Sequence, residues 1–198
     1  MAELITGRPA LIVVDMQVGG EGSGIPFMGG YEEQAAGAIR MVEAARANGV
    51  SVVFIQEVHR PDHVDFGREL DGAEGVHCVE GHPSTELDPR LRPGKGDYHI
   101  VKRRYSAFFG TDLEILLKGL KARTLILCGG LTDVCVHYTF VDAHQHDYHV
   151  RVAEDCCGGS TLARHEASLD AMEYLQTGAR CTHDKVVAAF NGLGRKAA

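Results

Sequence analysis

The sequence predicts an α/β fold whose mostly parallel sheet is covered by helices on both faces. Apolar runs of strand length alternate with helical patterns along the chain, and this alternation is typical of parallel strands joined by crossover helices. The strand-like runs are rich in Val, Ile and Leu, as expected for strands buried on both faces. Because neither a repeat nor a linker interrupts the pattern, we expect one domain over residues 1–198.

The first elements follow directly from the pattern. Residues 9–15 are a proline, five apolar residues and Asp15, which fits a buried strand that ends at an acid. Over residues 31–48 apolar side chains recur at helical spacing, and Gly49 follows as a helix stop. Residues 50–57 contain several β-branched residues and form the second expected strand.

A long polar segment over residues 58–96 separates these elements from the rest. It is rich in His, Asp, Glu and Gly, and it is too long for an ordinary connection, so we expect a functional loop. Beyond it, short apolar runs mark strands and helical spacing marks helices. The expected strands are 98–102, 124–129, 149–153 and 179–182, and the expected helices are 111–121, 133–146, 160–176 and 184–191.

Composition argues against several kinds of partner. Lys and Arg number 20 against 27 Asp and Glu, a formal net charge of −7, whereas nucleic-acid binding needs a basic surface. No apolar run approaches the roughly 20 residues of a membrane span, and the first residues lack the basic region of a signal peptide. We therefore expect a cytoplasmic protein whose partners include neither nucleic acid nor a membrane.

The cysteines do not form a metal-binding or disulfide pattern, because none belongs to a C-x-x-C pair. In a reducing compartment we expect them to be free thiols, mostly in the core. A catalytic thiol would be the exception. The six positions are 78, 128, 135, 156, 157 and 181.

Cys135 is the candidate nucleophile because it follows the 124–129 strand at the expected start of a helix. Thr132 and Asp133 could cap that helix, and backbone amides at a helix N-terminus favour a thiolate. The same amides could receive the oxyanion formed when a thiolate attacks a carbonyl. A buried core cysteine is the alternative, and position alone does not separate the two.

Asp15 and Lys102 each end a strand-like run. Asp15 either caps a turn or points into a site, and a lysine at a strand end is more often solvated. Together with Cys135 they form a plausible unit, since a desolvated carboxylate can take the thiol proton. The ammonium group could hold that carboxylate in place and favour the thiolate.

Three stretches carry a family resemblance: ALIVVDMQ around Asp15, VKRRYSAFFGTDL around Lys102, and LILCGGLTDVCVHYTFVDAHQHDYHVRVAEDCC around Cys135. In this order and spacing the chain resembles the isochorismatase-like cysteine hydrolases, from about Pro9 to Gly178. The resemblance implies a three-layer α/β/α sandwich with a central, mostly parallel six-stranded sheet. It also implies hydrolysis of a C–N bond in a small amide, ureido or carbamoyl compound through a thioester, and a homo-oligomer, dimer or tetramer.

The resemblance assigns roles to individual residues. Asp15 is expected to be the general base, Lys102 its charged partner and Cys135 the nucleophile. A non-proline cis peptide is expected between Gly130 and Leu131, with the amides of Leu131 and Cys135 receiving the oxyanion. The expected substrate pocket is formed by Gln17, Tyr105, Phe108, Phe109 and Tyr138.

The loop after the first strand departs from the family pattern. Relatives often read D-x-Q-N-D-F there, whereas this chain has Asp15-Met16-Gln17-Val18-Gly19-Gly20. The three proposed catalytic residues are unaffected, but one pocket wall differs. Nicotinamide, biuret-like, ureidoacrylate-like and lactam substrates therefore all remain open.

A metal site is the main alternative reading of the segment after the second strand. Nicotinamidases bind a divalent metal through an Asp-x-His and later histidines, and Glu57, His59, His63 and His77 lie at comparable places. Carboxylate and imidazole together suit Zn, Fe or Mn. The run E-x-H-R-P-D also resembles relatives that hydrolyse ureido compounds without metal, so a requirement for a cofactor is not expected.

Three other functions stay open. The first is a nicotinamidase with a bound divalent metal. The second is an isochorismatase proper, which cleaves a vinyl ether and does not need a thiol nucleophile, so a cysteine at position 135 favours C–N hydrolysis. The third is a non-catalytic binding or scaffold protein, whose signature would be loss of one of the three catalytic residues, all of which are present.

Overall fold

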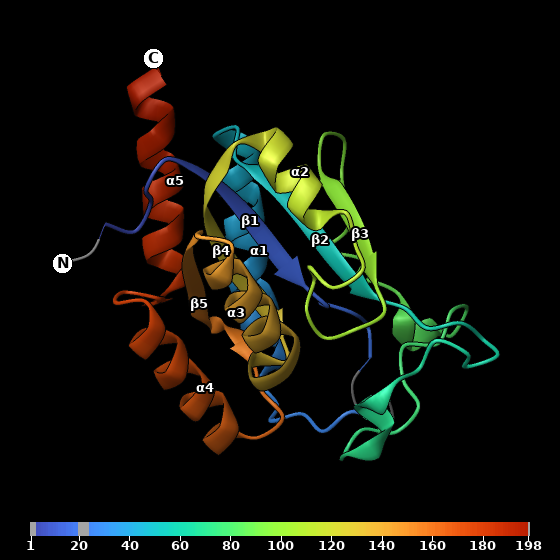
Figure 1. Ribbon diagram of the computed structural model, residues 1–198. Helices are drawn as coiled ribbons and strands as arrows, with labels where there is room; N and C mark the ends of the chain where they lie inside the picture. Colours follow the sequence, from blue (N-terminus) through green and yellow to red (C-terminus); the bar gives the residue numbers. More distant parts are fainter. Residues whose placement is uncertain (1–2, 20–23, 198) are drawn as a thin grey trace.

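A single six-stranded sheet forms the centre of the molecule (Figure 1). The computed structural model describes residues 3–19 and 24–197. Neighbouring strands are all parallel, in the order β3-β2-β1-β4-β5-β6. The strands are β1 (Arg8–Val14), β2 (Ser51–Glu57), β3 (Tyr98–Lys102), β4 (Ala122–Gly130), β5 (His149–Gly158) and β6 (Arg180–Cys181).

Helices cover both faces of the sheet, which confirms the predicted three-layer α/β/α sandwich. Figure 1 shows α1 behind the sheet with α5 beside it, and α2, α3 and α4 in front. No helix in the described ranges has both the length and the apolar character that a membrane span needs. The helices are α1 (Tyr31–Ala47), α2 (Leu113–Leu120), α3 (His137–Gln145), α4 (Leu162–Leu175) and α5 (His183–Ala197), with short turns η1 (Arg68–Asp71), η2 (Pro83–Thr85) and η3 (Thr132–Val136).

The core explains why the strand predictions succeed. Every residue of β1 after Arg8 is buried, as are most residues of β2 and β4. Helix α1 presents small side chains such as Ala35 and Ala38 to the sheet, and both are fully buried. Burial of these apolar side chains is the main favourable term in folding.

The strand order creates a crevice between β1 and β4. The chain leaves β1 toward β2 and β3, then returns to the other side of β1 to form β4. In open parallel sheets, ligands bind beyond the carboxyl ends of the strands where the order reverses in this way. Asp15 follows β1 at this place, and η3, which contains Cys135, follows β4.

Strand β5 is longer than predicted. The expected strand ended at residue 153, because Glu154 and Asp155 indicated a turn, but the strand continues to Gly158. Glu154 accepts a hydrogen bond from Arg180 at 2.6 Å, and Asp155 accepts one from His183 at 2.7 Å. These partners lie far along the chain, so the local sequence could not show that the two acids would be satisfied inside a strand.

Candidate active site

Asp15, Lys102 and Cys135 come together at the carboxyl edge of the sheet. Lys102 Nζ lies 2.9 Å from Asp15 Oδ2 and donates to Cys135 Sγ at 3.3 Å. Lys102 is 1% exposed and Cys135 7% exposed. Asp15 forms a buried ion pair with Lys102, and one of its carboxylate oxygens lies within 4.8 Å of Cys135 Sγ.

Glu57 is a fourth member of this cluster. It ends β2 and stands opposite Lys102 in the β2–β3 register. Its Oε2 contacts Lys102 Nζ and accepts from Cys135 Sγ at 3.4 Å. The sequence indicated Glu57 only as a possible metal ligand. The signal for its contact with Lys102 is that both residues end adjacent parallel strands.

Burial sets the proton affinities of the proposed base and nucleophile. Desolvation raises the pKa of Asp15 to about 6, against the opposing effect of Lys102, and the charge of Glu57 adds to the rise. Burial also raises the pKa of the Cys135 thiol well above its usual range, although Lys102 alone would lower it. The resting sulfur is therefore a neutral thiol, placed beside a carboxylate that can accept its proton.

The same cluster keeps its other two members charged. Burial alone would lower the pKa of Lys102, but Asp15, Cys135 and Glu57 hold it well above its usual range. Burial alone would likewise raise the pKa of Glu57, but Lys102 and two histidines hold it well below its usual range. Lys102 is thus an ammonium group between two carboxylates.

The turn that carries Cys135 differs from the predicted helix start. The helix expected over residues 133–146 is divided into η3, a π-helical turn, and α3. Thr132 and Asp133 do not cap it, and the residue at the N-cap position is Leu131, whose side chain makes no capping bond. The peptide between Gly130 and Leu131 is cis, at the position that the resemblance indicated.

Thr132 and Asp133 instead hold the turn against the first turn of α4 and the segment that precedes it. Thr132 Oγ1 shares a hydrogen bond of 2.8 Å with Nδ1 of His165. The Asp133 carboxylate accepts from the backbone amide and the hydroxyl group of Ser160. The N-cap assignment was wrong because these side chains find tertiary partners, which a local pattern cannot reveal.

A cavity of about 600 Å³ opens above Cys135. Its walls include apolar side chains from the loop after β1, such as Ile25 and Phe27, together with Leu131 and Val134. Several polar groups that the sequence analysis did not single out also line it, most of them from the first turn of α1 or the 58–96 segment. They are Tyr31, Glu32, Gln34, Glu74, Cys78, Ser84, Asp88 and Arg90.

Of the five expected pocket residues, the structure places only Gln17 and Tyr105 at the cavity wall. Phe108 stacks on His146, with ring centroids 5.2 Å apart. Phe109 and Tyr138 are 66% and 54% exposed. The Tyr138 ring lies 5.5 Å from that of Tyr105, so it stands behind the cavity wall rather than in it.

Gln17 lines the cavity, and its side-chain amide is hydrogen-bonded to the backbone of neighbouring segments. Its Nε2 donates to the carbonyls of Glu57 at 3.0 Å and Thr85 at 2.7 Å. Its Oε1 accepts from the Glu57 backbone amide at 3.1 Å. Gln17 therefore ties the end of β1 to the end of β2 and fixes the position of Glu57.

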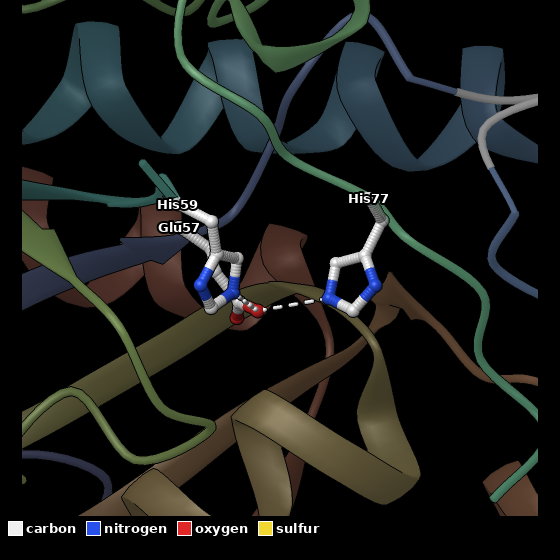
Figure 2. A group of neighbouring side chains, drawn as sticks. All are labelled: Glu57, His59 and His77. Atoms are coloured by element: carbon white, nitrogen blue, oxygen red, sulfur yellow. Dashed lines mark hydrogen bonds and ion pairs between the residues drawn. The ribbon is translucent and has the colours of Figure 1, made fainter. Parts of the chain in front are cut away.

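Three of the four proposed metal ligands converge. Figure 2 shows the rings of His59 and His77 on either side of the Glu57 carboxylate. Glu57 Oε1 lies 3.3 Å from Nε2 of His59 and 3.1 Å from Nε2 of His77. The structure does not bring His63 into this group, since its side chain is exposed and its ring meets the edge of Phe66.

The chemistry of this group fits a divalent metal. A tetrahedral ion with ligands at about 2.0–2.1 Å separates neighbouring ligand atoms by about 3.3 Å, close to the observed distances. The second nitrogen of His77 shares a hydrogen bond of 2.6 Å with the Gly75 carbonyl, whereas Nδ1 of His59 lies 3.4 Å from Asp65 without an aligned hydrogen bond. Such partners orient metal-binding imidazoles.

Comparison with known proteins places the chain in a family. The model of the isochorismatase domain matches residues 9–185. The ureidoacrylate amidohydrolase RutB of Yersinia enterocolitica is 33% identical over 188 residues, 83% of this chain and 78% of that protein.

Two solved structures share the fold closely. A cysteine hydrolase from Pseudomonas syringae pv. phaseolicola superposes with a TM-score of 0.87 at 28% identity, covering 97% of each chain. The pyrazinamidase of Pyrococcus horikoshii in complex with zinc superposes with a TM-score of 0.78 at 27% identity, covering 88% of this chain and 99% of that one. The sequence match, the sheet order and these superpositions agree: the chain belongs to the isochorismatase family.

Proposed function

We propose that this protein hydrolyses a C–N bond in a small amide, ureido or carbamoyl compound, with Cys135 as the nucleophile. The observation that carries the proposal is a buried thiol in contact with Lys102 and Glu57, with an Asp15 carboxylate oxygen within 4.8 Å of the sulfur, at a cavity of about 600 Å³. The similarity to a ureidoacrylate amidohydrolase supports this class of reaction.

The proposed reaction uses Asp15 as the proton carrier. Asp15 takes the Cys135 proton as the sulfur attacks the substrate carbonyl carbon, and the backbone amides of Leu131 and Cys135 receive the oxyanion. The C–N bond then breaks, and Asp15 returns the proton to the leaving nitrogen. Water hydrolyses the thioester and restores the thiol. A base with a pKa of about 6 is largely ionised at neutral pH.

Ammonia release from a panel of small amides and ureido compounds tests this proposal. Cys135→Ala should abolish release from every compound that the wild-type protein hydrolyses. Cys78 supplies the matched control. Its thiol also lines the cavity, but it does not belong to the proposed catalytic group of Asp15, Lys102 and Cys135. Cys78→Ala should keep most of the activity. Full turnover by Cys135→Ala would refute the proposal.

The two other reaction classes receive less support. A scaffold protein has no need to keep a buried ammonium group between two carboxylates beside a thiol, an arrangement that costs several kcal/mol of desolvation per ion. A vinyl ether hydrolase has no need for the thiol. Both alternatives predict that Cys135→Ala changes only the stability of the protein and not its ammonia release. The same panel therefore distinguishes either alternative from C–N hydrolysis by Cys135.

A metal-assisted variant of the reaction is a second candidate, favoured by the Glu57, His59 and His77 geometry. These three residues would hold the ion, and a bound Zn, Fe or Mn would supply a Lewis acid to a substrate nitrogen or oxygen. The pyrazinamidase superposition, a structure with zinc, supports this candidate. Elemental analysis after gentle purification tests it. About one metal ion per chain, lost in His77→Ala, is expected, whereas a metal-free and fully active protein would exclude it.

We further propose that the protein acts in the cytoplasm as a homo-oligomer. Apolar side chains exposed on α4 support self-association: Leu162 is 64% exposed, Tyr174 89% and Leu175 40%. Light scattering coupled to size exclusion should give a dimer or tetramer mass at micromolar concentration. A monomer mass across that range would contradict self-association.

A further inference from the structure

We infer that the cavity selects substrates without an anionic group, so that the true substrate is an uncharged or cationic amide, ureido or carbamoyl compound. The inference deepens the proposed function and rests on it for the reaction class. It differs from what the most similar sequences suggest, because ureidoacrylate, for which one relative is named, carries a carboxylate. The charges that line the cavity carry the argument.

The inner part of the cavity is acidic. Asp15 and Glu57 line the cavity beside Cys135, and Glu74 lines it as well. The single buried ammonium group, Lys102, lies between Asp15 and Glu57 and is committed to both. A substrate carboxylate that reached this depth would meet two carboxylates that already share the available positive charge.

Glu74 places an acidic group at the cavity wall, and burial raises the pKa of its carboxyl group. Its Oε2 accepts a hydrogen bond from the Tyr105 hydroxyl group at 2.9 Å and lies 4.0 Å from Nε2 of His77. Its side chain is 12% exposed, so solvent screens it only partly. Any group of the substrate that extends from the reacting carbonyl toward Tyr105 would face this acid.

The rim offers no free cation to compensate. Within the described residues, Arg90 is the single Arg or Lys that lines the cavity. Its guanidinium donates four hydrogen bonds to carboxylates, two to Asp88 at 3.0 and 2.7 Å and two to Glu32 at 2.8 and 3.2 Å. A guanidinium has five N–H groups, so at most one N–H of Arg90 is left for a substrate carboxylate, which would still lie beside the two acids that Arg90 already pairs with.

In the metal-free protein, the balance of charge in the cavity is therefore negative. Five carboxylates line the cavity, against Arg90, the buried Lys102 and a histidine. Even with that histidine protonated, the acids remain in excess. Bringing an anionic substrate next to these carboxylates costs free energy, whereas a cationic group is attracted to them. The cavity therefore repels anions and accepts neutral or cationic groups. The lining carboxylates are Asp15, Glu32, Glu57, Glu74 and Asp88.

Thiol reagents of different charge measure this potential at Cys135 without knowledge of the substrate. The probes are methanethiosulfonates with a neutral methyl, a cationic trimethylammonioethyl or an anionic sulfonatoethyl group. Each forms a mixed disulfide with the thiolate and releases methanesulfinate. Rates at Cys135 are read from peptide masses on the full chain after treatment with chelator, and each is divided by the rate for a small free thiol.

We expect the normalised rate of the cationic reagent to exceed that of the anionic one by about tenfold or more, the effect of one or two net charges at short range. The ratio should fall as salt is added. Equal rates, or a faster anionic reagent, would overturn the inference.

Charge removal at two lining acids sharpens the test. Glu32→Gln and Glu74→Gln should each lower the cation-to-anion ratio several-fold, as about one unit charge is lost. Glu33→Gln is the matched control, since Glu33 neighbours Glu32 on the exposed first turn of α1 but does not line the cavity. If Glu33→Gln lowered the ratio as much as Glu32→Gln, the cavity acids would not be its source.

Paired substrates separate this inference from the proposed function. Maleamate and maleamide share a skeleton and differ in one carboxylate. We expect the kcat/KM for ammonia release to be at least about tenfold higher for the uncharged diamide. A higher value for maleamate would overturn the charge inference and leave C–N hydrolysis standing. Full ammonia release by Cys135→Ala would end the proposed function, while the reagent ratios would still decide the charge of the cavity.

Discussion

Lys102 is the residue on which the arrangement of the site depends. Its ammonium group contacts Asp15, Glu57 and Cys135, which come from three other segments of the chain. At this scale the sequence predicted the three catalytic candidates but not the part played by Glu57. A residue's type and position at a strand end are visible in sequence, whereas a contact between two strand ends depends on the register of the sheet.

Lys102→Met should both inactivate and destabilise the protein. The change leaves two buried carboxylates without their cation, which typically costs about 3–5 kcal/mol. The free energy of unfolding from urea denaturation measures the loss. Lys118→Met is the control, because Lys118 pairs with Glu114 on the exposed face of α2 and its removal should leave the free energy of unfolding almost unchanged. Equal effects of the two changes would contradict the account.

The pH dependence of kcat/KM should report the ionisation of Asp15. Its pKa is raised to about 6, and the base must be unprotonated to take the thiol proton. Activity is therefore present above about pH 6 and falls as the pH drops through that value, by about tenfold per unit further down. A profile that stays flat from about pH 7 to 5 would exclude Asp15 as the base. Asp15→Asn should lose the activity.

At the scale of elements, the close approach of β4 to β1 positions the site. Gly129 has φ +116°, and an added Cβ would lie 1.9 Å from the Val14 carbonyl oxygen. Both residues belong to the strands that bound the crevice. A side chain at this position would push apart the strand ends that carry Asp15 and the turn with Cys135.

Gly129→Ala should therefore destabilise the fold by more than about 2 kcal/mol and lower the activity, because strain and a backbone clash add together. Gly119→Ala in α2 is the control, since nothing lies within 4 Å of its added Cβ and its φ is ordinary. That change should be neutral or slightly stabilising, as Ala favours a helix. Thermal unfolding of both variants makes the comparison.

Elements whose burial is uniform were predictable, and those that rely on distant partners were not. Residues 9–14 of β1 and 125–128 of β4 are apolar and buried, so their sequences identify these strands. The second half of β5 holds Glu154 and Asp155, which Arg180 and His183 satisfy from later elements. The start of the Cys135 turn was misread for the same reason, because Thr132 and Asp133 bind His165 and Ser160.

At the scale of the whole molecule, one ion-pair network joins α1 to the 58–96 segment at the mouth of the cavity. Arg90 bridges Asp88 and Glu32, and Asp88 accepts a hydrogen bond from the Tyr31 hydroxyl group at 3.0 Å. The sequence marked the segment as functional by its length and polarity. It could not show which of its charges face the cavity, since that depends on how a segment without regular structure folds back over the sheet.

The network should make the protein sensitive to acid. Hydrogen bonds from Arg90 lower the pKa of Asp88 to about 2, below its unfolded value of about 4. The resulting stability is present above about pH 4 and is lost as the pH falls toward 2. Asp88→Asn should cost about 1–2 kcal/mol near pH 7, allowing for the exposure of Arg90.

Urea denaturation at several pH values measures this effect, and the difference between Asp88→Asn and wild type should vanish near the pKa of Asp88. Asp62→Asn serves as the control, because Asp62 is exposed and accepts a hydrogen bond from the nearby Val64 amide. A stability difference for Asp88→Asn that did not change with pH would show that packing rather than charge is responsible.

Trapping of the covalent intermediate tests the central claim most directly. The protein is quenched in acid while it turns over an amide from the panel, and its peptides are weighed. The account predicts that the peptide containing Cys135 gains the mass of the acyl group, that Cys78→Ala behaves in the same way, and that Cys135→Ala shows no adduct. An acyl group on Cys78, or turnover by Cys135→Ala without any adduct, would contradict it.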